Sequence, residues 1–71
     1  MAKAQYDVMP QRGGWLVRLA SDSTSEWYPD KGEAVRRAHE LARRYSEWRV
    51  RVFSQAGKLE QETASSAEAS H

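Results

Sequence analysis

The stretch SEWRVRVF, residues 46–53, decides the fold because its side chains alternate strictly in character. Successive residues of a β-strand point to opposite faces of the sheet. Val50 and Val52 are therefore expected on one face, and Arg49 and Arg51 on the other. We predict a strand over residues 48–54 with one face buried in the core and the other face not packed against another element.

Two further strands precede this stretch. Residues 6–10 (YDVMP) and 15–20 (WLVRLA) are apolar runs joined by QRGG, whose glycines suit the positive φ of a tight hairpin turn. We predict a β-hairpin there. Two shorter segments, Glu26–Tyr28 and Leu59–Thr63, have a weaker strand character, and the sequence leaves open whether they form strands.

A helix is predicted between these strands. Asp30 suits the N-cap, and Glu33 follows three residues later, as in a capping box. From Lys31 to about Glu47 the apolar residues recur at helical spacing. The expected fold class is therefore α+β: a small antiparallel sheet of three to five strands, in the order β-β-(β)-α-β-(β), with one amphipathic helix packed on one face.

The predicted core combines the inward positions of the strands with the apolar stripe of the helix. Its members are Tyr6, Val8, Trp15, Val17, Leu19, Val35, Ala38, Leu41, Ala42, Tyr45, Val50 and Val52. We expect one compact domain over residues 1–63. Residues 64–71 (ASSAEASH) contain no large apolar side chain to offset the entropy of ordering, so we expect a disordered tail.

Composition limits the classes of function. The 71 residues include no cysteine, which excludes thiol catalysis and cysteine-based zinc sites. No apolar run approaches the roughly 20 residues of a membrane-spanning helix. The N-terminus lacks the apolar segment of a signal peptide. We therefore expect a cytoplasmic protein that does not bind membranes, and its net charge of +1 implies no strong overall field.

Motifs along the chain resemble those of a family of short, uncharacterised bacterial proteins known as domain of unknown function 2188. The motifs read YDVMP at residues 6–10, GGWLV at 13–17, KGEA at 31–34, AHELAR at 38–43, VRV at 50–52 and GKL at 57–59. This resemblance implies a compact bacterial α+β domain. It implies no catalytic residue, ligand or partner.

The sequence offers no recognisable catalytic arrangement. His39 begins HELAR, in which Arg43 stands where the zinc motif H-E-x-x-H requires its second histidine. No serine lies in a G-x-S-x-G motif, and RGGW lacks the spacing of a phosphate-binding loop. We predict that the protein is not an enzyme, has no catalytic residues, and needs no cofactor or metal.

The sheet face opposite the helix carries the candidate binding residues. Our first hypothesis is nucleic-acid binding, mostly through the phosphate backbone, with Arg18, Arg49 and Arg51 contacting phosphates. Phe53 and Trp27 would stack on bases. DNA and RNA are not distinguished by these residue types.

A second hypothesis assigns the same face to protein recognition. Met9, Leu16 and Phe53 are expected there beside the arginines, and protein interfaces are enriched in aromatics, methionine and arginine. An open sheet face can be buried by forming a homodimer or by binding another protein. A third interpretation is a solvated polar face without a partner, which one-sided antiparallel sheets normally show.

Overall fold

The computed structural model describes residues 3–20 and 24–65, which form five strands and one helix. The elements are β1 (Lys3–Gln11), β2 (Gly14–Leu19), β3 (Ser25–Tyr28), α1 (Lys31–Ala42), β4 (Glu47–Phe53) and β5 (Leu59–Ala64). Both segments that the sequence left open therefore form strands. Residues 66–71, most of the expected disordered tail, lie outside the described residues.

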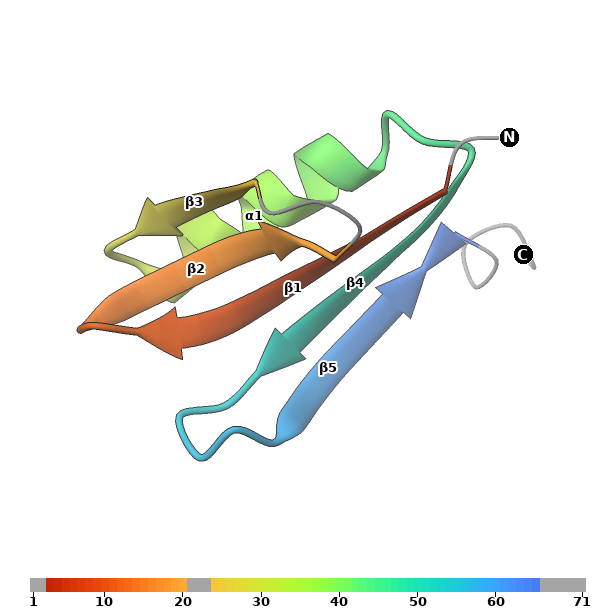
Figure 1. Ribbon diagram of the computed structural model, residues 1–71. Coiled ribbons are helices and arrows are strands. Elements are labelled where there is room, and N and C mark those ends of the chain that lie inside the picture. The colour runs from red at the N-terminus through yellow and green to blue at the C-terminus, as the bar shows by residue number, and fades with distance from the viewer. Residues whose placement is uncertain (1–2, 21–23, 66–71) are drawn as a thin grey trace.

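The five strands form one mixed sheet in the order β3-β2-β1-β4-β5 (Figure 1). The prediction of a purely antiparallel sheet was wrong, because β4 pairs with β1 in parallel. A parallel partner cannot be reached through a tight hairpin. The chain instead leaves the edge strand β3, runs through α1 and returns beside β1. The first strand thus becomes the centre of the sheet.

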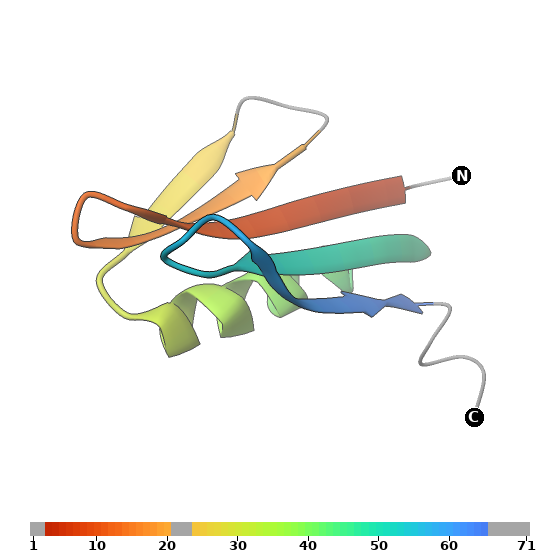
Figure 2. The same ribbon diagram turned by 90° about the horizontal axis from the view of Figure 1, so that it is seen from below.

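Helix α1 covers one face of β1 to β4 (Figure 2) and contacts β5 through the ion pair of Lys31 with Glu60. The Asp30 side chain caps its N-terminus by accepting a hydrogen bond from the backbone N–H of Glu33 at 3.2 Å. Its buried side is made of Ala34, Ala38 and Ala42, all with no exposed surface. Such small side chains allow the helix backbone to lie close to the sheet.

The helix ends at Ala42, which corrects the predicted end near Glu47. The N–H of Tyr45 donates to the carbonyl of Ala42 at 2.9 Å, and the N–H of Arg44 to that of Leu41 at 3.3 Å. These three-residue hydrogen bonds tighten and terminate the helix. Glu47 is then free to begin β4, where it aligns with the start of β1. Strand pairing has overridden the helical periodicity.

The core lies between α1 and the sheet. Val8, Val17, Val50 and Val52 are its largest fully enclosed side chains, each no more than 2% exposed. Trp48, absent from the predicted core, is also buried because it shares the face of Val50 and Val52. Six partly buried residues pack around this core, five of which were expected to be part of it. They are Trp15, Leu19, Tyr28, Val35, Leu41 and Tyr45.

Candidate functional site: the open face of the sheet

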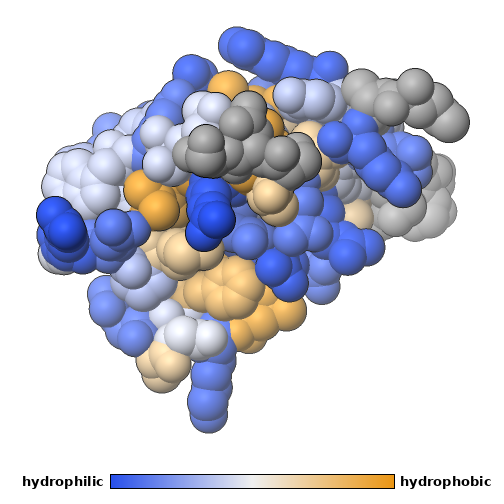
Figure 3. All heavy atoms as spheres, in the orientation of Figure 1, coloured by the Kyte–Doolittle hydropathy of each residue, from blue (hydrophilic) through white to orange (hydrophobic). Residues whose placement is uncertain are grey.

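We call the sheet surface that faces away from α1 the open face. In Figure 1 the sheet lies in front of the helix, so Figure 3 shows this face in the same orientation. Its side chains alternate with buried ones along β1 and β4. Two groups of residues cross it from strand to strand, one apolar and one charged.

The apolar band consists of Trp27, Leu16, Met9, Phe53 and Leu59, one residue from each strand. The pairings are Trp27 with Leu16, Leu16 with Met9, and Phe53 with Leu59. Met9 and Phe53 each follow the paired residues Val8 and Val52 of the two parallel strands, which brings them to the same level. Hydrophobic colour gathers on this part of the face in Figure 3. Trp27 and Leu59 are 50% and 49% exposed, the largest exposures among the big apolar side chains described.

Trp27 is held against the hairpin between β1 and β2. Its indole Nε1–H donates to the carbonyl of Gln11 at 3.0 Å, and its ring lies where a side chain on Gly14 would be. The positive φ angles of the turn belong to Arg12 and Gly13 instead. Gly14 is therefore required for the close approach of the indole, and the expectation that both glycines serve the turn was wrong.

The charged row consists of Arg18, Asp7, Arg51 and Glu62, which are successive cross-strand neighbours on β2, β1, β4 and β5. The charges alternate in sign along it. The Arg51 guanidinium donates twice to the Asp7 carboxylate, at 3.1 and 3.3 Å, and lies 5.2 Å from the Phe53 ring centre. The Asp7 carboxylate accordingly raises the pKa of Arg51.

Arg49 lies beside this row and also has an acidic partner. Its Nε is 3.2 Å from a carboxylate oxygen of Glu62. Arg18 is exposed at the other end of the row, next to Asp7. Both Arg49 and Arg51 therefore form ion pairs within their own sheet.

The five residues proposed from the sequence, Arg18, Arg49, Arg51, Phe53 and Trp27, all lie on the open face. Sequence reasoning missed the roles of Glu62 and Leu59, both on β5. Their strand was recognised only weakly because LEQETA lacks a regular apolar alternation. The signal that could have identified them is the QAGK turn, which folds residues 59–64 back onto β4.

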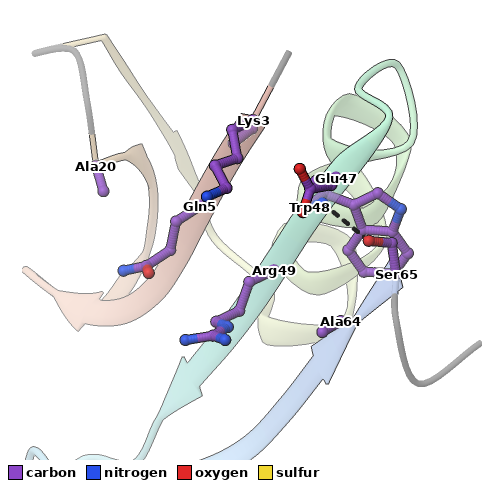
Figure 4. A pocket seen from close by; sticks show the side chains of 9 residues that line it. Lys3, Gln5, Ala20, Glu47, Trp48, Arg49, Ala64 and Ser65 are labelled. Carbon is purple, nitrogen blue, oxygen red and sulfur yellow. Dashed lines mark hydrogen bonds between the residues drawn. The ribbon is translucent and has the colours of Figure 1, made fainter. Parts of the chain in front are cut away.

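A hollow of about 460 Å³ lies at the end of the sheet away from the apolar band (Figure 4). The side chain of Ser65 accepts a hydrogen bond from the N–H of Trp48 at 3.1 Å, so this hydroxyl fastens the end of β5 to the start of β4. The hollow holds both signs of charge, which makes it a polar recess without a clear preference for an ion. It is lined by Lys3, Ala4, Gln5, Ala20, Glu47, Trp48, Arg49, Ala64 and Ser65.

Across residues 3–20 and 24–65, no three His, Cys, Asp or Glu side chains gather closely enough to hold a metal ion. In the same residues, α1 is too short and too polar to cross a membrane.

A family model described as "Uncharacterized protein conserved in bacteria (DUF2188)" matches residues 6–65, and the chain belongs to this family. The match covers α1 and strands β2 to β5 in full, and β1 from Tyr6 onward. No curated protein and no solved structure matches the chain.

Proposed function

We propose that this member of the DUF2188 family is a non-enzymatic protein-interaction module whose open face packs against a protein surface. The observation that carries the proposal is the apolar band, which places one large apolar residue on each of the five strands. Single exposed apolar residues are ordinary, whereas a contiguous patch on a small protein is typical of an interaction site.

The composition of the open face supports the same proposal. Phe53, Trp27 and Met9 belong to the residue types that are enriched at protein interfaces, and so do the neighbouring arginines. The molecule measures 35 × 23 × 17 Å, so its broad face covers at most about 800 Å². An interface of standard size buries about 800 Å² on each partner, so it would occupy most of this face.

Nucleic-acid binding through Arg18, Arg49 and Arg51 remains the competing prediction. Two of these guanidiniums already pair with carboxylates, Arg51 with Asp7 and Arg49 with Glu62. A phosphate would have to displace or share those partners, and both acids would repel it. A row of alternating signs suits a protein surface better than a polyanion, whose recognition favours a cluster of one sign.

Site-specific photocrosslinking tests the proposal. A photoreactive phenylalanine analogue placed at Phe53 reports what touches the open face in the bacterium that encodes the chain. The matched control carries the same analogue at Arg36, an exposed position on the helix. We expect protease-sensitive adducts from position 53 and none of the same mass from position 36.

Other adducts would overturn the proposal. Nuclease-sensitive adducts at position 53 would support nucleic-acid binding instead. The absence of any adduct at that position would support a solvated face without a partner. Salt gives a second readout, because phosphate contacts weaken steeply with ionic strength and a mainly apolar interface does not.

A further inference from the structure

We infer that the partner of the open face is a second copy of this chain, related by a two-fold axis that runs parallel to the strands between β1 and β4. This inference rests on the proposed function. It follows from the order of charges in the charged row and from the positions of the apolar residues beside them.

A two-fold rotation about one axis makes the charged row of one copy complementary to the charged row of the other. From β2 to β5 its members read Arg18, Asp7, Arg51 and Glu62, so the signs are plus, minus, plus, minus. The midpoint of this row falls between β1 and β4. A two-fold axis there turns β1 onto the partner's β4 and β2 onto the partner's β5. Each cation then faces an acid of the other copy.

The contacts at the two ends of the row differ from those at its centre. Asp7 and Arg51 already form an ion pair within one copy, and the axis makes it a four-membered cluster of alternating charge. Arg18 gains the Glu62 carboxylate of the second copy, which it shares with Arg49 of that copy. Within one copy, Arg18 and Glu62 lie on strands separated by β1 and β4, roughly 14 Å apart at the usual strand spacing, which is beyond direct contact.

The same axis also aligns the apolar band. It places Met9 of one copy opposite Phe53 of the other, and Leu16 opposite Leu59. Trp27, on the edge strand β3, would lie at the rim. One operation thus satisfies both groups of residues, which is the expected property of an interface between identical surfaces.

Other two-fold axes fit the face less well. An axis along β1 would oppose Asp7 of one copy to Asp7 of the other, and Arg18 of one copy to Arg51 of the other. Both contacts bring like charges together. An axis across the strands at the level of the charged row would oppose Asp7 to Asp7 and Arg51 to Arg51, and one at the level of the apolar band would leave the charged row without charged partners in the other copy. The proposed axis avoids both conflicts.

Charge reversal in two separate chains tests the inference. Arg18→Glu alone and Glu62→Arg alone should each place like charges opposite one another twice in a dimer, since the two-fold axis doubles every contact. We expect each variant to associate at least about tenfold more weakly than the wild type, because opposed like charges cost several kcal/mol. The measurement is sedimentation equilibrium over micromolar to millimolar concentrations.

Mixing the two variants is the decisive step. In a mixed dimer one contact is the wild-type pair of Arg18 with Glu62 and the other is the same pair with its signs exchanged, so both are attractive and an equimolar mixture should regain association near the wild-type level. Neutral variants, Arg18→Gln and Glu62→Gln, serve as matched controls: their mixed dimer regains only one Arg18–Glu62 pair and relieves no repulsion, so mixing should strengthen association far less. Thermal unfolding of every variant separates weakened association from a damaged fold.

The outcomes distinguish this inference from the proposed function. A wild-type chain that stays monomeric at millimolar concentration overturns the inference, and so does a dimer that mixing fails to restore. If adducts at Phe53 nevertheless contain a different protein, the proposed function stands and only the identity of the partner was wrong. If position 53 yields no protein adduct at all, both fail.

Discussion

The two faces of the sheet are built from the same strands, yet one is closed and the other is open. On the helix side, Val8, Val17, Val50 and Val52 are at most 2% exposed, and the described residues include no buried charged side chain. On the open face, Trp27 is half exposed, and Arg51 and Asp7 form an ion pair. The alternation of side chains along the strands creates two sheet surfaces, and the single helix covers only one of them.

The helix closes its face by close approach. Its three buried alanines present almost no side-chain bulk, so the valines of the sheet meet the helix backbone directly. No comparable element covers the open face in the part of the chain that the structure describes.

The sharpest comparison uses two adjacent residues of β4. Val50→Asp buries a carboxylate in the core and should abolish folding. The free-energy cost of burying an unpaired charge is comparable to or larger than the roughly 5–15 kcal/mol that stabilises a small domain. Arg49→Asp, one residue earlier on the open face, should change the free energy of unfolding by less than about 1 kcal/mol. Circular dichroism during thermal unfolding measures both. Equal losses would contradict the assignment of faces.

The packing of the helix gives the next effect. Ala38→Leu adds bulk between α1 and the sheet, where Ala38 has no exposed surface. Overpacking of this kind costs about 1–3 kcal/mol, which corresponds to a fall in melting temperature of several degrees. Arg36→Leu on the exposed side of the same helix is the control and should leave the melting temperature nearly unchanged. A stabilised Ala38→Leu variant would show that the interface has unfilled space.

The ion pair at the centre of the open face should matter less. Asp7→Asn removes the negative charge and one of the two oxygens that accept hydrogen bonds from Arg51. The Asp7 and Arg51 side chains are 13% and 33% exposed. Partial exposure reduces the value of the pair, so we expect a loss of about 1 kcal/mol or less. A double-mutant cycle with Arg51→Gln, followed by urea unfolding, gives the coupling energy. A coupling near zero would mean that the pair does not stabilise the monomer.

The smallest expected effect is a pH dependence on the helix side, at the edge of the sheet. The Tyr28 hydroxyl, and then Arg37, donate hydrogen bonds to Glu26 and lower the pKa of its carboxyl group. A lowered pKa in the folded state stabilises the fold above the pKa of the unfolded chain. This contribution is lost as the pH falls through the folded-state value.

The variant Glu26→Gln tests whether the Glu26 carboxylate contributes to the pH dependence of stability. The variant should unfold with a weaker acid dependence below about pH 4.5, and its stability near neutral pH should fall less than that of Asp7→Asn. Urea unfolding at pH 3 and pH 7 compares the two chains. An unchanged acid dependence would assign the effect to other carboxylates.

Local patterns predicted much of the fold. The alternation around Val50 identified the buried and open faces of β4, and the capping residues Asp30 and Glu33 located the start of the helix. The same alternation would have placed Trp48 in the core, had it been applied one residue pair earlier. These features depend on residues near one another in sequence, so the sequence is sufficient to reveal them.

Tertiary structure decided what depends on distant partners. Strand β4 pairs with β1 across more than 40 residues of sequence. This pairing makes the sheet mixed and begins β4 soon after α1 ends at Ala42. It also brings Asp7 within hydrogen-bond distance of Arg51. The sequence determined which side chains face away from the helix. The register between strands that are distant in the sequence decided which of these side chains become neighbours. That register therefore also decided that the arginines of β4 are paired with acids.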